Sequence, residues 1–306
     1  MAVALAAVGV FALVGISSGH KALAAAVSPD WGLATVSLFL AAAVQPFRAL
    51  AWSTTLRAPV GFRALYASSS IGSLLDTILP GRLGEASKAA VLRVTTGSRW
   101  PGFPRAAGSL LCSHMLEACA FTTVGAGAAV VLPLPGWARV GLGAGCGLST
   151  AAIGASALLH GKLGHRLPRA LDRFFAGASA PPRVLVRAAG ILLATWIVRW
   201  FAILLMLHSL GVRAGVGTAL LYMIVTGLAN TAPLLPGNVG LYQGAAIGAL
   251  AMAGVSGTQA SAVSLVAPVF ATLGTAIAAA VGLALFGRRA FDLSRAAVLR
   301  SEPTSA

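Results

Sequence analysis

One stretch of the chain places charged side chains and a helix break inside an apolar region. Its sequence is Leu79-Pro80-Gly81-Arg82-Leu83-Gly84-Glu85, and Lys88 follows almost one helical turn later. Arg82, Glu85 and Lys88 are spaced by three residues, so on a helix they share one face. Arg82 and Lys88 suit an anionic headgroup such as a phosphate, with Glu85 as their counter-ion or as a ligand for an amine. Gly81 and Gly84 would let the backbone approach a ligand closely, and a restarting helix offers free N–H groups to an anion. The same spacing also fits a self-satisfied ion-pair ladder that seals the break, so both interpretations stay open.

Three further charges fall in the middle of apolar segments: Arg48, Glu117 and Arg199. A charge at bilayer depth costs about 2.5–3.5 kcal/mol on insertion scales, so each of them needs a partner or a function. We expect Glu117 to pair with Arg82, Arg48 or Arg199. Arg48 and Arg199 each lie on a helix that leads into a break, which allows both to face one central cavity, although a purely structural tie of Arg199 to a carboxylate remains an alternative.

The helix break recurs in the second half of the chain as Leu235-Pro236-Gly237-Asn238-Val239-Gly240. Two broken-helix signatures in corresponding positions are typical of transporters whose binding site lies at the interface of two repeats. We therefore add Gly237, Asn238 and Gln243 to the candidate substrate-binding residues. Asn238 and Gln243 also suit a local role as caps of interrupted helices.

The composition places the chain in a membrane. Of its 306 residues 58% are hydrophobic and only 9% are charged, and apolar runs of about 20 residues recur along its length. The net charge of +15 does not indicate a nucleic-acid partner, because the basic residues lie between apolar segments and form no separate domain. Retention of positive residues on the cytoplasmic side explains them.

The pattern predicts an all-α polytopic membrane protein with about six transmembrane helices, two re-entrant helical hairpins and both termini in the cytoplasm. The expected spans are 2–19, 31–52, 106–131, 137–159, 188–208 and 261–286, the last ending at Arg288-Arg289. The hairpins cover 64–92 and 214–255. The arms of the first are too short to cross a hydrocarbon core of about 30 Å, and the second contains the Pro236-Gly237 break. Two short tilted spans are the alternative for the first hairpin, but they would place several arginines outside the cell.

This layout makes the two halves of a single transmembrane domain, 1–306, inverted repeats of each other. The first repeat covers about 31–131 and the second about 188–286, and each carries a Leu-Pro-Gly tip. The tips should approach the bilayer midplane from opposite leaflets. Between the repeats, the basic loop 160–187 is expected to hold a short amphipathic helix that lies on anionic headgroups.

Four sets of residues carry a resemblance to a known family. They are Gln45-x-x-Arg48-x-x-x-Trp52, the Leu79 to Lys88 block, Glu117 on the next helix, and Pro233-x-x-Pro236-Gly237-x-Val239-Gly240. Together they resemble the transmembrane flippase region of lysylphosphatidylglycerol synthases and its stand-alone relatives. The resemblance implies lipid translocation and not lipid synthesis, since the soluble aminoacyltransferase domain is missing. Two positions depart from the family pattern: Ala118 replaces an Arg, and Gln243 stands where a Glu is common.

We therefore expect a lipid flippase that moves a polar, phosphate-bearing headgroup across the bacterial plasma membrane. An ion or small-solute transporter, and a non-transporting partner of a lipid synthase or glycosyltransferase, are the alternatives. Enzymatic activity is not expected, because the sequence has no Walker A, Gly-x-Ser-x-Gly or His-Glu-x-x-His motif. We predict no cofactor and no metal. A membrane lipid is the expected partner, with a homo-oligomer or an enzyme of lipid synthesis left open.

Overall fold

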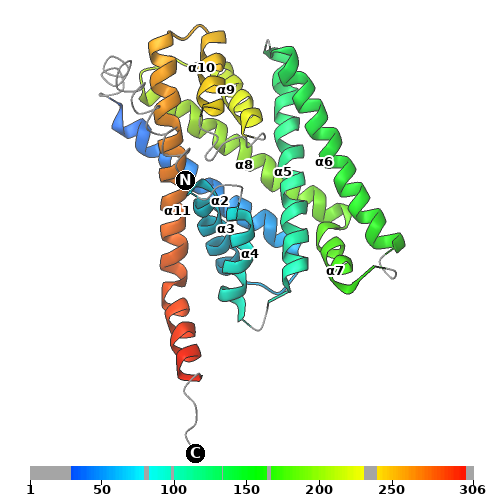
Figure 1. The fold of residues 1–306 in the computed structure, drawn as a ribbon. Coiled ribbons are helices and arrows are strands. Elements are labelled where there is room, and N and C mark those ends of the chain that lie inside the picture. Colours follow the sequence, from blue (N-terminus) through cyan, green and yellow to red (C-terminus); the bar gives the residue numbers. More distant parts are fainter. Residues whose placement is uncertain are drawn as a thin grey trace, which may run out of the picture.

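The computed structural model describes residues 29–78, 83–97, 100–132, 134–163, 167–230 and 240–300. In these ranges the chain forms ten helices and no strand (Figure 1). The helices are α2 (Trp31–Leu56), α3 (Phe62–Ile78), α4 (Leu83–Thr96), α5 (Phe103–Val131), α6 (Gly136–Leu163), α7 (Arg169–Ala178), α8 (Pro182–Ser209), α9 (Val216–Ala229), α10 (Leu241–Met252) and α11 (Gly257–Arg300).

Five of these helices are long and apolar enough to cross a membrane. They are α2, α5, α6, α8 and the Gly257–Phe286 part of α11, each with 26 to 30 residues in its apolar stretch. They coincide with five of the six predicted spans, so the prediction of an all-α polytopic membrane protein is confirmed. The sixth predicted span, 2–19, lies outside the described residues.

Helices α2 and α8 form the centre of the molecule and run obliquely between the steeper α5 and α11 (Figure 1). They pack antiparallel along their length: the Asp30 N–H donates to the Ser209 carbonyl at 2.9 Å, and the Ser37 hydroxyl donates to the Ala202 carbonyl at 2.8 Å. This hydrogen bond between the helices gives the Ser37 hydroxyl a partner, which lipid could not provide. This central pair brings Arg48 and Arg199 into one region of the fold.

Helices α3 and α4 form a close pair of short helices. At 17 and 14 residues, they extend about 25 and 21 Å, less than a hydrocarbon core of about 30 Å. The first turn of α3 and the last part of α4 enter one apolar cluster through Leu65 and Leu92, together with Leu56 at the end of α2. The pair therefore starts and ends at the same end of the molecule.

Helices α9 and α10 form the corresponding pair in the second half, with 14 and 12 residues. Ala219 near the start of α9 and Leu250 near the end of α10 share a cluster with Leu210 after α8 and Val263 in α11. This cluster includes the carboxyl end of α8, whereas the α3–α4 cluster includes the carboxyl end of the antiparallel α2. The two helix pairs thus begin and end at opposite ends of the bundle, as Figure 1 also shows.

The predicted amphipathic helix of the basic loop is α7. One face of it packs against α5, where Gly108 of α5 meets the Phe174 carbonyl and Gly177 of α7 meets the Arg105 carbonyl so closely that neither site has room for a Cβ. Arg57 reinforces the contact by donating to the carbonyls of Ala176 and Ser179 at 2.6 Å. Helix α7 is therefore built into the bundle through its small residues, while its basic residues point outward.

The last helix continues beyond the end of its predicted membrane span. The predicted span stopped near Phe286, before Arg288-Arg289, but α11 extends to Arg300. Basic residues end an apolar span because they leave the hydrocarbon region, yet Arg is a strong helix former and gives no stop signal to the backbone. The predicted end of the span at Phe286 agrees with the apolar part of α11, and the helix itself continues to Arg300.

Candidate functional site

A cavity of about 160 Å³ lies between α2, α8, α9, α10 and α11, where the central pair meets the second helix pair. Its wall combines charged, hydroxyl-bearing and apolar side chains. The polar members are Ser37, Gln45, Arg48, Arg199, Tyr222, Thr226, Tyr242 and Thr275. No carboxylate belongs to this wall within the described part of the chain.

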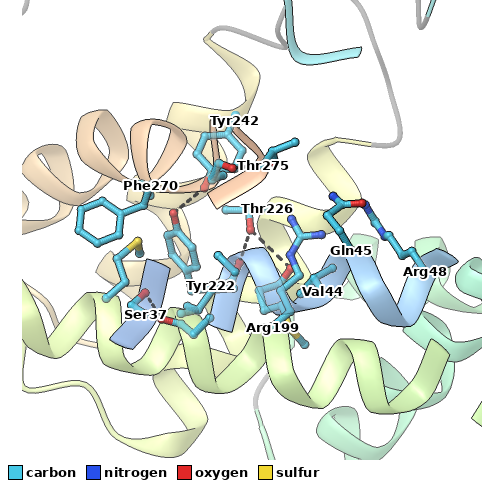
Figure 2. Close-up of a pocket in the computed structure, with 17 residues that line it drawn as sticks. Ser37, Val44, Gln45, Arg48, Arg199, Tyr222, Thr226, Tyr242, Phe270 and Thr275 are labelled. Carbon is cyan, nitrogen blue, oxygen red and sulfur yellow. Dashed lines mark hydrogen bonds between the residues drawn. The ribbon is translucent and has the colours of Figure 1, made fainter. Parts of the chain in front are cut away.

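The cavity is chemically divided along its length. In Figure 2 the two arginines and Gln45 lie toward one end, and the tyrosines and Phe270 lie toward the other. The hydroxyls of Tyr222 and Tyr242 are hydrogen-bonded to each other at 2.7 Å, which joins α9 to α10. The cavity therefore offers positive charge at one end and a hydroxyl-bearing aromatic surface at the other.

Arg199 has no ion pair with a carboxylate among the described residues. Its guanidinium lies over the Trp196 ring at 5.1 Å from the centroid, a cation–π contact. The indole of Trp196 is itself fixed, because its Nε1 donates to the Glu117 carbonyl at 3.2 Å and its ring packs on Phe121 at 4.7 Å. Arg199 is thus a positioned cation that faces the cavity.

Arg48 forms an ion pair with Glu117 of α5, which leaves part of its guanidinium for the cavity. The carboxylate is 15% exposed and the arginine side chain 27%. The Arg48 Nε is buried with no hydrogen-bond partner in the described structure. A charge this deeply buried is tolerated when an opposite charge is hydrogen-bonded to it, and Glu117 has this role.

The ion pair belongs to a longer chain of charged groups. Glu117 Oε2 lies 3.8 Å from His114 Nδ1, and His114 Nε2 lies 2.6 Å from Glu85 Oε2. The other Glu85 oxygen accepts a hydrogen bond from Lys88 Nζ at 2.6 Å. Acidic and basic groups therefore alternate from α4 through α5 to Arg48, at the cavity wall on α2.

Two glycines place this network by allowing α3 and α4 to touch. A Cβ at Gly84 would overlap the backbone of Asp76, and one at Gly72 would overlap the side chain of Lys88. The Ser68 hydroxyl of α3 also donates to the Lys88 carbonyl of α4. Since Glu85 directly follows Gly84, the depth of this contact sets where the Glu85 carboxylate meets His114.

The predicted site residues have different places in the structure. Arg48 and Arg199 line the cavity, and Glu85, Lys88 and Glu117 form the adjoining network. Gly84 lies in the α3–α4 contact, and Gln243 caps α10 by accepting the Gly240 N–H at 2.6 Å. The predicted tip residues Gly81, Arg82, Gly237 and Asn238 lie outside the described residues.

Two parts of the site are missing from the sequence-based candidates. His114 is not among the residues singled out from the sequence, yet it lies between Glu85 and Glu117. Its i, i+3 spacing to Glu117 is visible in the sequence, but the contact with α4 is not. Tyr222 and Tyr242 belong to no sequence motif. The one signal in the sequence is that each lies on one of the two short apolar segments that flank the second Pro-Gly break.

These features define an all-helical multi-pass membrane protein with a charged cavity among its helices. The chain belongs to the lysylphosphatidylglycerol synthase TM region family, whose model matches residues 1–296. The family resemblance deduced from the motifs is thereby confirmed. No curated protein and no solved structure matched the chain.

Proposed function

We propose that this protein is a bacterial plasma-membrane lipid transporter that moves a phosphate-bearing headgroup through the cavity between its two halves. One observation carries the proposal: Arg48 and Arg199 line the same cavity, and Arg199 has no carboxylate partner in the described part of the chain. A cation inside a membrane span costs about 2.5–3.5 kcal/mol on insertion scales, and an anionic group of the substrate would offset this cost while it is bound.

The chemistry of the wall favours the phosphate as the recognised group. Guanidinium groups bind phosphate oxygens in a bidentate way, and hydroxyls can bond the remaining oxygens or a glycerol moiety. The name of the family refers to the lipid lysylphosphatidylglycerol, whose lysyl group is cationic. The described wall offers that cation no carboxylate, so we propose recognition of the phosphate, which anionic and aminoacylated phosphatidylglycerols share.

The arrangement of the helices supports transport rather than simple binding. Two pairs of short helices enter from opposite ends of the bundle, one carrying the Glu85 network and the other the tyrosine pair of the cavity. We propose that they are re-entrant hairpins of an inverted repeat, whose rocking exposes the cavity to each leaflet in turn. Arg57 and Arg105, tied to each other and to the α7 end, mark the proposed cytoplasmic end.

The test is lipid translocation in proteoliposomes. Phosphatidylglycerol with a fluorophore on one acyl chain is placed in the membrane, and its arrival in the outer leaflet is followed by chemical quenching. Arg199→Gln should lower the rate at least tenfold. Arg187→Gln, an exposed arginine on the same helix, is the matched control and should keep the wild-type rate.

The interpretation is decided by three comparisons. Equal melting temperatures of the two variants show that Arg199→Gln has not simply unfolded the protein. A wild-type rate in Arg199→Gln would refute the site. Fluorescent phosphatidylglycerol and lysylphosphatidylglycerol, compared side by side, show whether the phosphate alone suffices, and transport of neither lipid would refute the proposed function.

A further inference from the structure

His114 lies between two carboxylates that come from different helices. Its Nε2 is 2.6 Å from Glu85 of α4, and its Nδ1 is 3.8 Å from Glu117 of its own helix. The His114 side chain is 39% exposed on the surface of the bundle. A neutral imidazole has one N–H and can donate to only one of the two carboxylates, whereas the protonated ring presents an N–H to both. The two ring nitrogens of His114 therefore face carboxylates from two different helices.

Glu117 is shared by two cationic groups. Arg48 forms an ion pair with one of its oxygens, and His114 approaches the other. Among the residues that the structure describes, the remaining charged groups around this pair are Glu85 and Lys88 of α4, Asp76 of α3 and Arg199 of α8, which act on Arg48 or Glu117 over longer distances. Lys88 is held by Glu85 at 2.6 Å and is 7% exposed, so it is not available as a replacement partner for Glu117.

The cavity connects this pair to the proposed substrate. Arg48 lines the cavity and also neutralises Glu117. A phosphate bound between Arg48 and Arg199 would share the positive charge of Arg48, and Glu117, which is only 15% exposed, would lose part of its compensation. A proton on His114, taken from water, restores the balance from the other side of the carboxylate.

We propose that His114 is the binding site of a coupling proton, so that the protein takes up one proton together with one anionic headgroup. This inference rests on the proposed function, because it needs the headgroup at Arg48. It adds a second transported species and names its site. By thermodynamic reciprocity, each ligand strengthens the binding of the other, and low pH favours headgroup binding.

The experiment measures binding of a short-chain phosphatidylglycerol to the full-length protein in detergent, by quenching of tryptophan fluorescence between pH 6 and 9. If one proton is taken up with each headgroup, the dissociation constant rises by about tenfold per pH unit in the upper part of this range. His114→Gln keeps a hydrogen-bonding group beside Glu85 but cannot carry the proton, so its dissociation constant should be independent of pH.

His160→Gln is the matched control, because His160 also contacts a carboxylate, Asp172 at 3.2 Å, but lies outside the network. It should keep the wild-type pH dependence. Proton uptake on lipid addition, read with a pH indicator in weakly buffered solution, should approach one per headgroup in the wild type and zero in His114→Gln.

The outcomes separate the two proposals. Binding that does not change with pH in the wild type, or a wild-type pH dependence in His114→Gln, overturns the coupling proton while the lipid site stands. Absence of phosphatidylglycerol binding at every pH overturns the proposed function itself. If His114→Gln fails to fold, Glu117→Gln provides the second variant. Without the carboxylate that Arg48 and His114 share, no proton is needed, so lipid binding should persist and lose its pH dependence. A pH dependence of binding that is retained in Glu117→Gln refutes the inference.

Discussion

A single methyl group at Gly84 should separate Glu85 from His114 and so break the charge network between α4 and α5. The Cβ of Gly84→Ala would lie closer than 3.0 Å to the backbone N and Cα of Asp76, whereas ordinary contacts between carbon atoms are about 3.5–4.0 Å. Helices α3 and α4 must therefore separate by about 1 Å. Overpacking of this kind costs about 1–3 kcal/mol.

The same displacement acts on the neighbouring residue. Glu85 is held 2.6 Å from His114, and an added 1 Å or so would take the pair beyond normal hydrogen-bond length. We expect a lower melting temperature together with loss of the pH dependence of lipid binding. The stability is measured by thermal unfolding in detergent and the binding by the tryptophan assay.

Gly190→Ala provides the control, because a Cβ there meets nothing within 4 Å on α8. It should be neutral or slightly stabilising, since Ala is the better helix former by up to about 1 kcal/mol. A Gly84→Ala protein with wild-type melting temperature and unchanged pH dependence would show that the close α3–α4 contact does not position Glu85.

Two further predictions concern pairs in and beside the cavity. Arg48→Ala leaves Glu117 buried without its main partner and should destabilise the protein by about 3–5 kcal/mol. The double variant Arg48→Ala, Glu117→Ala should recover much of this loss. Equal melting temperatures of the single and double variants would contradict the pairing. Tyr242→Phe removes one member of the hydroxyl pair and leaves the buried Tyr222 hydroxyl unsatisfied, at a cost of about 1–3 kcal/mol in thermal unfolding, while replacement of both tyrosines by Phe should cost less than the single change.

The membrane-spanning helices could be predicted because their physical requirement is visible in one dimension. A bilayer demands about 20 apolar residues per crossing, and α2, α5, α6, α8 and α11 each contain such a run. The short helices α3 and α4 were visible as arms too short to cross, and α9 and α10 were visible as the two sides of a Pro-Gly break. The predicted span within α11 ends at Phe286, as its apolar part does, and the helix continues to Arg300 because the limit of an apolar span and the limit of a helix are set by different forces.

The charged residues of the site could be identified one by one, but their partners could not. Arg48, Glu117 and Arg199 attract attention because charge in an apolar run is costly. Three partners were possible for Glu117, and only the packing of α2 against α5 selects Arg48. His114 was undervalued because a single histidine on an apolar helix gives no hint of the carboxylate that α4 brings to it.

The sequence by itself determined that the chain lies in a membrane, where its helices are interrupted and which side chains carry charge, because bilayer thickness and the cost of buried charge act on each segment separately. Only the tertiary structure decided that Arg199 faces a cavity and that His114 joins two carboxylates. Those facts depend on how each helix is rotated about its own axis, and that rotation is set by contacts such as Gly84 against Asp76, between residues of different helices.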